Sequence, residues 1–277
     1  MSSLDDGTGG TCSDRRVGEP LNVTGALMPM AIGGSRWLHL GYRDLRSMYA
    51  QSRLGPLWSM ASVLVTAVAL GVVFSRLFGL PTEGYFLYLL TGLTVWGLIG
   101  RALGEGPSSL VDSRGLLLNT ALTAYEAGMR AWWRSALMFL ISLPVVLIAL
   151  MVLDRPSAHA LWFLAGVLIV FAFSGALTLL MSLLGVFIPF ARYAIPPLSQ
   201  LLFLLTPIIW TPGLRPEVAS LVALNPFYYP VAVVRDPLIG LEVPLGTWSI
   251  AIAEVVILCA LAWPILTRVN VSVKGQV

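Results

Sequence analysis

The sequence predicts an all-α integral membrane protein with six transmembrane helices. It also predicts an N-terminal amphipathic interface helix, and a re-entrant helix pair between the fifth and sixth spans. Hydrophobic residues make up 57% of the 277 residues and charged residues only 11%, against roughly 45–50% and about 25% in soluble domains. Mean hydropathy is +0.84. Several uncharged runs approach the roughly 20 residues that a helix needs to cross a bilayer. Lipid is therefore the solvent for much of the chain.

Two regions follow from this composition. Residues 1–35 are predicted to form a disordered cytoplasmic tail, and residues 36–277 a single transmembrane domain. The tail could be mistaken for a signal peptide, because Arg15 and Arg16 precede the apolar stretch ALMPMAI. That stretch is short and contains Pro29, whereas the apolar part of a signal peptide is longer and uninterrupted.

The segment from about residue 37 to residue 53 predicts an amphipathic helix. Apolar and aromatic residues recur along it at steps of four, three and four, which places them on one helical face. Such a helix lies in the membrane interface, although an ordinary juxtamembrane anchor fits these residues equally well. The candidate residues of this interface helix are Trp37, Tyr42, Arg43, Asp44, Arg46, Tyr49 and Arg53.

An elbow is predicted where this helix ends. Gly55 and Pro56 precede Trp58 and open an uncharged stretch of 22 residues, 54–75. Proline disfavours helix at the residue before it. The chain is therefore expected to turn here from a helix on the membrane to a helix through it.

The uncharged runs define the six predicted spans. Their bounds are about 56–78, 84–103, 132–153, 160–186, 196–212 and 246–267. One further uncharged run is cut by Asn225-Pro226 and Pro230 into pieces too short to cross, and it predicts a re-entrant pair at about 215–240. There, Asn225 is expected to cap a helix whose first residue is Pro226. A seventh span is the alternative.

Basic residues predict the orientation. In this topology, 13 Lys and Arg residues lie on the side of the two termini and 4 lie on the other side. Cytoplasmic loops carry the excess of such residues, so both termini are predicted to be cytoplasmic. Outside the membrane-like runs the sequence has no basic stripe with interleaved aromatic residues, so it does not predict a nucleic-acid partner.

The sequence also lacks the P-loop motif of an ATPase. A P-loop requires a lysine followed by Ser or Thr, and the single lysine, Lys274, is followed by glycine. ATP hydrolysis must therefore come from another polypeptide, and no catalytic residues or cofactor are predicted in this chain. Cys12 and Cys259 are too isolated to indicate a metal site. Glu254 is the clear acid within a span; it is expected to make a helix–helix contact or to lie on a transport pathway.

Four stretches, YRDLRSMYAQSRLGPLWSM, YFLYLLTGLTVW, LTPIIW and ALNPFYYPVAVVRDPLIG, resemble the membrane subunit of polysaccharide-exporting ABC transporters. These type-2 ABC permeases move lipid-linked O-antigen, teichoic acid or related glycans across the bacterial cytoplasmic membrane. The resemblance runs from about Trp37 to the C-terminus. It implies a homodimer, with each copy docked on an ATPase subunit that binds ATP and Mg.

The resemblance also implies roles for particular segments. The interface helix would lie beside the ATPase. A coupling helix within about 104–128 would insert into the ATPase, with Asp112 and Arg114 as candidate contacts, although this loop departs from the family's basic-apolar-proline run. The re-entrant pair would narrow the outer end of the channel. Its candidate gate residues are Asn225, Pro226, Arg235 and Asp236.

Aromatic residues are the candidates for a sugar channel, because their rings pack on the C–H faces of sugars while Tyr and Trp also offer a polar group. The candidates are Tyr88, Trp96, Phe203, Phe227, Tyr228 and Tyr229. Aromatics also form interfacial belts, which is the favoured interpretation of Tyr85 and Trp210. Two other functions remain open: a type-2 permease for a drug or simple lipid, and an ion-coupled secondary transporter.

Overall fold

The computed structural model describes residues 36–50, 55, 57–120, 122–153, 160–212 and 219–269. The predicted tail at 1–35, Arg53 of the interface helix and Pro56 of the elbow lie outside the described residues. Residues 37–277 group as one compact unit. All regular structure in the described part is helical, which confirms the all-α class. The helices are α1 (Arg36–Met48), α2 (Leu57–Phe78), α3 (Thr82–Gly104), α4 (Gly106–Asp112), α5 (Arg114–Asn119), α6 (Ala124–Val152), α7 (Ala160–Phe187), α8 (Ala191–Leu205), α9 (Ala219–Ala223), α10 (Tyr228–Leu238) and α11 (Leu245–Val269).

Five helices in the described part of the chain are long and apolar enough to cross a membrane: α2, α3, α6, α7 and α11. The fifth predicted span, at 196–212, has a different form. Its helix, α8, begins at Ala191 and has only 15 residues. It ends at Leu205 because Pro207 lacks an N–H group and disfavours helix at Thr206, whose backbone is extended.

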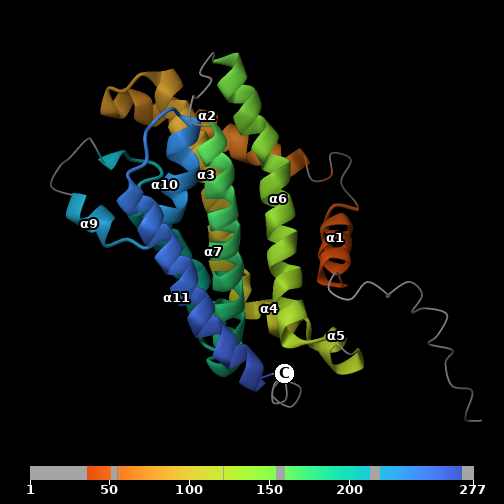
Figure 1. The fold of residues 1–277 in the computed structure, drawn as a ribbon. Coiled ribbons are helices and arrows are strands. Elements are labelled where there is room, and N and C mark those ends of the chain that lie inside the picture. Colours follow the sequence, from red (N-terminus) through yellow and green to blue (C-terminus); the bar gives the residue numbers. More distant parts are fainter. Residues whose placement is uncertain are drawn as a thin grey trace, which may run out of the picture. The chain divides into compact units, whose positions relative to one another are not determined.

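The bundle is centred on α3 and α7. In the most apolar 18-residue stretch of each helix, 67% of the residues of α3 and 56% of those of α7 are buried, against 11% in both α2 and α11. α7 contacts α3, α4, α6, α10 and α11, and Figure 1 shows it in the middle of these helices. α4 and α5 lie near one end of the bundle, and α10 lies towards the other end.

Small residues allow two short helices to approach α7 closely. A methyl group at Gly185 would come within 1.7 Å of the carbonyl oxygen of Pro107 in α4. A methyl group at Gly166 would come within 2.2 Å of the carbonyl oxygen of Val233 in α10. Helices in membranes commonly pack through such small residues, because there is no hydrophobic driving force between them.

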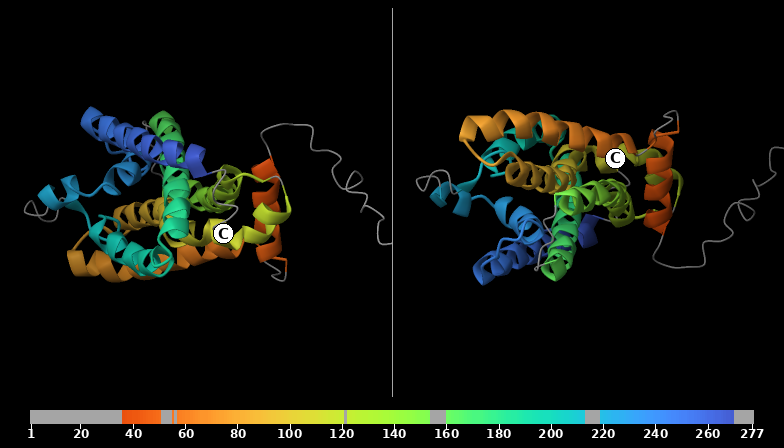
Figure 2. Two further views of the ribbon diagram at one scale, coloured as in Figure 1. Left: turned by 90° about the horizontal axis from the view of Figure 1, so that it is seen from below. Right: turned by 90° about the horizontal axis from the view of Figure 1, so that it is seen from above.

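α2 packs on the bundle through one narrow face. Ala67, Gly71 and Ser75, spaced by four residues, are its buried positions, and the ring of Phe86 in α3 lies against Gly71. The helix crosses α3 at a steep angle, which is visible in both the side view and the views from above and below (Figures 1 and 2).

The elbow has a turn where the sequence predicts one. Gly55 has a φ of 54°, a conformation that glycine adopts without steric cost. The backbone N–H of Trp58 donates to the Gly55 carbonyl at 3.2 Å, and the Trp58 side chain is exposed. The preceding helix, α1, ends at Met48, whereas the sequence extends it to residue 53.

Candidate functional site

Arg235 in α10 is a charged side chain with only 2% of its surface exposed. Its Nε donates to Oδ1 of Asp236 at 2.7 Å, and its Nη1 donates to the carbonyl of Pro207 at 2.6 Å. Its guanidinium carbon lies 4.1 Å from the centre of the Tyr88 ring in α3. A buried charge is costly unless it is paired and hydrogen-bonded. These contacts meet that condition, and they join α10, α3 and the segment after α8.

The charge of Arg235 is fixed. An arginine guanidinium does not lose its proton in proteins, because its pKa lies far above physiological pH. Arg235 is therefore positive throughout the physiological pH range. It serves as an electrostatic anchor and not as a proton carrier.

Two tyrosines of α3 hold the non-helical segment that follows α8. The hydroxyl of Tyr88 donates to the Pro207 carbonyl at 2.7 Å and also reaches the Trp210 carbonyl at 3.1 Å. The hydroxyl of Tyr85 donates to the carbonyl of Ile209. Non-helical backbone is tolerated at membrane depth only where it is buried in protein or lines a cavity. The tyrosines and Arg235 thus satisfy the carbonyls that the break after α8 leaves without helical partners.

Asn225 ties the same segment to the start of α10. Its side-chain amide donates to the hydroxyl of Thr206 at 3.0 Å, and its Oδ1 accepts from the backbone N–H of Phe227 at 2.9 Å. The second contact is an Asx turn. The Asn225 side chain thus makes the bond to the N–H two residues on that an N-cap residue makes, although regular helix in α10 begins at Tyr228 and not at the expected Pro226.

The predicted gate residues therefore lie in one contact network. Asn225, Arg235 and Asp236 are connected through the segment after α8, while Pro226 is exposed beside them. We call this set, with Tyr85 and Tyr88, the α8-end network. Its role in gating stays a prediction.

A group of aromatic rings lies next to this network. Trp96 in α3 lies 5.7 Å from Phe203 in α8 and 6.0 Å from Phe227, measured between ring centres. Phe227 lies 6.2 Å from Phe173 in α7. Trp96, Phe203 and Phe227 are half-buried, whereas Phe173 is buried. The structure thus brings three of the candidate channel aromatics together: Trp96, Phe203 and Phe227.

The other predicted channel aromatics have different surroundings. Tyr88 and Tyr229 are buried, and the hydroxyl of Tyr229 donates to the carbonyl of Ala223 at 2.7 Å. Tyr228 is half-buried, with its ring centre 5.3 Å from that of Tyr229. The hydroxyls of Tyr88 and Tyr229 are therefore engaged within the protein, and Trp96, Phe203 and Tyr228 are the more accessible candidates.

A second cluster joins α1 to α6. Nε and Nη2 of Arg130 donate to the two carboxylate oxygens of Asp44 at 2.6 and 2.7 Å. A methyl group at Gly41 would come within 2.8 Å of the Arg130 carbonyl oxygen. The ring centre of Trp37 lies 6.0 Å from that of Trp132. Asp44 and Trp37 thus face the protein, and we call this contact the α1–α6 junction.

The remaining interface-helix candidates face away from this junction or adjoin it. Tyr42, Arg43 and Arg46 are exposed, and Tyr49 is half-buried in the turn after α1. The apolar face predicted from the steps of four, three and four consists of Leu38, Tyr42, Leu45 and Tyr49. On this face Leu45 is 3% exposed, but Tyr42 is 56% exposed. The side of α1 that contacts the protein is therefore rotated from the predicted face.

A further ion pair lies one turn along α6. Nη2 of Arg134 donates to Oε2 of Glu105, which directly precedes α4, at 2.5 Å. The candidate coupling residues lie at the other end of α4: Asp112 is its last residue, and Arg114 is the first of α5. Both are exposed and flank the buried Ser113. Sequence reasoning missed both ion pairs, although Arg130 and Arg134 are spaced by one helical turn.

The role of Glu254 in α11, as a helix–helix contact or as part of a transport pathway, stays a prediction. Its Oε2 is buried without a hydrogen-bond partner among the residues that the structure describes. Within that same part of the chain, no cluster of three or more His, Cys, Asp or Glu side chains is placed to hold a metal ion.

Comparison with known proteins identifies the family. Residues 36–239 match the ABC-2 type transporter family. The chain belongs to this family. O-antigen export system permease proteins RfbA are similar to this ABC-2 transporter chain. One from Klebsiella pneumoniae is 26% identical over 189 residues, covering 66% of this chain and 72% of the relative. The one from Myxococcus xanthus is 25% identical over 193 residues, covering 68% and 74%.

The matched region of this ABC-2 transporter runs from the start of α1 into the residues just after α10. It contains the α1–α6 junction, α4 and α5, the aromatic group and the α8-end network. Glu254 lies beyond it. The family assignment and the apolar helices together indicate a multi-pass membrane protein with a transport role.

Proposed function

We propose that this chain is the membrane subunit of an ATP-driven exporter that moves a lipid-linked polysaccharide or oligosaccharide across the bacterial cytoplasmic membrane. A separate ATPase subunit, with its bound ATP and Mg, supplies the energy. Two copies of this chain and two ATPase subunits form the transporter. The names of the O-antigen export relatives and the absence of a P-loop lysine support this proposal.

The aromatic group is the observation that favours a glycan over a drug as the substrate. Trp96, Phe203 and Phe227 form one half-buried surface across α3, α8 and the start of α10. Aromatic rings pack on the C–H faces of sugars, and the indole N–H of Trp96 offers a donor for a hydroxyl. This surface is the proposed contact with the passing glycan.

The course of α8 supports six crossings. α8 contacts α4, which follows the end of α3. The segment after α8 is bound by Tyr85, in the first turn of α3. α8 and its extension therefore run beside α3 for most of its length, and α3 is itself long enough to span. With six crossings, both termini lie on the same side, which we place in the cytoplasm because of the basic residues there.

In this topology, α4 and α5 lie at the cytoplasmic end, where the ATPase docks. The exposed Asp112 and Arg114 offer it opposite charges at the α4–α5 corner. α1 is the proposed interface helix beside the ATPase. α9 and α10 form the re-entrant pair at the outer end, and the α8-end network holds that gate in its closed form.

Reconstitution tests the proposal. The chain and its ATPase are placed in liposomes with a fluorescently labelled lipid-linked glycan, and movement of the glycan across the bilayer is followed. We expect transfer only when the chain, the ATPase and ATP-Mg are all present. Transfer without ATP, or driven by a proton gradient alone, would refute the scheme. Stimulation of the ATPase by a hydrophobic drug but not by the glycolipid would indicate a drug permease of the same family.

Trp96→Ala is the test variant, and Trp263→Ala is the control, because Trp263 is exposed on α11 and lies beyond the residues matched to the family. We expect Trp96→Ala to lower glycan transfer while basal ATP hydrolysis persists, and Trp263→Ala to change neither. Equal loss in the two variants would argue against a sugar contact at Trp96.

A further inference from the structure

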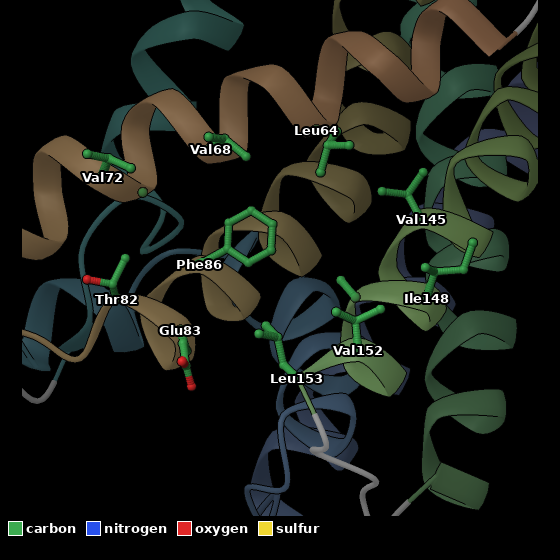
Figure 3. A pocket seen from close by; sticks show the side chains of 12 residues that line it. Leu64, Val68, Val72, Thr82, Glu83, Phe86, Val145, Ile148, Val152 and Leu153 are labelled. Carbon is green, nitrogen blue, oxygen red and sulfur yellow. The ribbon is translucent and has the colours of Figure 1, made fainter.

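A cleft lies between α2, the start of α3 and the end of α6. Its volume is about 510 Å³. Figure 3 shows Leu64, Val68 and Val72 projecting from α2 towards Phe86 and towards the α6 side chains Val145 and Ile148. The steep crossing of α2 over α3 holds the walls apart. Apart from Thr82 and Glu83, all the residues lining the cleft are apolar: Leu64, Val68, Gly71, Val72, Phe86, Val145, Ile148, Ala149, Val152 and Leu153.

The described part of the chain does not fill this cleft. Val68 remains 46% exposed, Val72 43% and Ile148 58%. All three helices are candidate membrane spans. The hydrocarbon layer offers no water to occupy such a space, and a void would lose dispersion contacts along its whole lining. An apolar chain must therefore fill the cleft in the membrane.

Charges of both signs mark the end of the cleft where α2 passes into α3. Glu83 is exposed in the first turn of α3 and lines the cleft with Thr82. Figure 3 shows both residues at one end of the apolar ring. Arg76 is exposed on α2 and follows Val72 by one helical turn, so the two side chains project on the same side of the helix. A carboxylate accepts hydrogen bonds from an ammonium group, and an arginine donates to a phosphate.

We propose that the cleft binds one acyl chain of a zwitterionic aminophospholipid, phosphatidylethanolamine in type. Its ammonium group contacts Glu83 and its phosphate contacts Arg76. An anionic lipid without an amine, including the phosphate-linked carrier of a glycan, would leave Glu83 facing a negative group. A second copy of this chain is the other candidate occupant, and loss of the dimer when the cleft is filled would reveal it.

Lipid retention tests the site. The protein is reconstituted in nanodiscs that contain phosphatidylethanolamine, phosphatidylglycerol and phosphatidylcholine in equal amounts, then released into mild detergent. The lipids that stay bound are measured by native mass spectrometry. We expect phosphatidylethanolamine to be retained preferentially by the unaltered protein. Val68→Trp, which fills the cleft from α2, and Ile148→Trp, which fills it from α6, should lower its retention roughly tenfold, equivalent to about 1.4 kcal/mol.

Val73→Trp is the matched control, because Val73 lies on α2, is 61% exposed and does not line the cleft. It should retain the lipid as the unaltered protein does. Glu83→Gln should abolish the preference for phosphatidylethanolamine over phosphatidylglycerol. Equal retention of the three lipids by the unaltered protein, or equal loss in Val73→Trp, would overturn the proposal. A loss of dimer with unchanged lipid in Val68→Trp would assign the cleft to a second copy instead. Displacement of phosphatidylethanolamine by a lipid-linked glycan would assign it to the substrate.

Discussion

At the scale of single residues, Arg235 determines how α10, α3 and the segment after α8 are held together. Burial removes water from its guanidinium group. In place of water, the guanidinium contacts Asp236, the Pro207 carbonyl and the face of the Tyr88 ring. Any opening of the proposed gate must therefore move these groups together or break a buried charged contact. Breaking it would leave an unpaired charge, which is costly. The network favours movement of α10 and the segment after α8 as one body.

Replacing Arg235 should destabilise the protein strongly. Arg235→Ala removes the ion pair of Asp236 and leaves the Pro207 carbonyl with one donor fewer, and we expect a loss of about 3–5 kcal/mol. Arg235→Lys keeps the charge but loses the planar guanidinium. Its melting temperature should lie between those of the unaltered protein and Arg235→Ala. Thermal unfolding of the purified protein in nanodiscs measures the effect. An unchanged melting temperature in Arg235→Ala would contradict the anchoring role.

The hydroxyl of Tyr88 should have a smaller, separable effect. Tyr88→Phe keeps the ring beneath Arg235 but removes the donor to Pro207 and Trp210, and it should cost about 1–2 kcal/mol. Tyr193→Phe is the control, because Tyr193 is 77% exposed; it should leave the melting temperature unchanged. If both variants melt alike, the hydroxyl of Tyr88 is not a structural donor.

At the scale of elements, α7 is the surface on which the short helices dock. Gly185 and Gly166 lie 19 residues apart on it and admit the backbones of α4 and α10. α7 therefore links the proposed coupling end to the proposed outer end through rigid backbone contacts. This arrangement requires glycine at both positions, because even a methyl group would overlap a carbonyl oxygen.

Gly185→Ala should push α4 away from α7. The new methyl group would lie 1.7 Å from a backbone oxygen, far inside van der Waals contact, so we expect a loss of several kcal/mol, of the order seen for core overpacking. Gly115→Ala in α5 meets nothing within 4 Å and should be neutral or slightly stabilising. Thermal unfolding compares the two. Similar behaviour of both variants would refute the close packing of α4.

Exchanging the charges of the α1–α6 junction tests whether α1 is fastened to α6. Asp44→Arg should destabilise the protein because it places a second cation beside Arg130, and Arg130→Asp should do the same with two anions. The double variant restores an opposite pair, and we expect a coupling energy of roughly 1–3 kcal/mol between the two sites. Arg43→Ala, at an exposed position, is the control and should change stability by no more than about 0.5 kcal/mol. Additive losses in the double variant would show that the pair does not act across the junction.

The elements that the sequence predicts best are those set by local pattern. Long uncharged runs locate α2, α3, α6, α7 and α11, because crossing hydrocarbon requires that composition. The end of α8 and the rotation of α1 are set by partners far along the chain. Asp44 pairs with Arg130, which lies 86 residues later in the sequence. The spacing of apolar residues in α1 gives no indication of this pairing. Tyr85 is predicted as a belt residue for the same reason, since its bond to the Ile209 carbonyl joins positions 124 apart.

At the scale of the whole molecule, the number of crossings determines the sidedness of the later part of the chain. If α8 and its extension cross, the α10–α11 connection lies opposite the α4–α5 corner, and the two termini share a side. If α8 does not cross, that connection lies on the same side as the corner, and the C-terminus lies opposite the N-terminus. The tight binding of the segment after α8 to the first turn of α3 favours the first arrangement.

Single cysteines distinguish these arrangements. In a background with Cys12→Ser and Cys259→Ser, Glu242→Cys places a thiol at an exposed position between α10 and α11, and Leu118→Cys places one at an exposed position in α5. We expect a membrane-impermeant maleimide to label Glu242→Cys in intact cells and to label Leu118→Cys only after permeabilisation. Labelling of neither position in intact cells would mean that α8 does not cross. Labelling of Leu118→Cys alone from outside would reverse the proposed orientation, and labelling of Glu242→Cys alone would place the α8-end network on the outer side, where a gate for an exported glycan must lie.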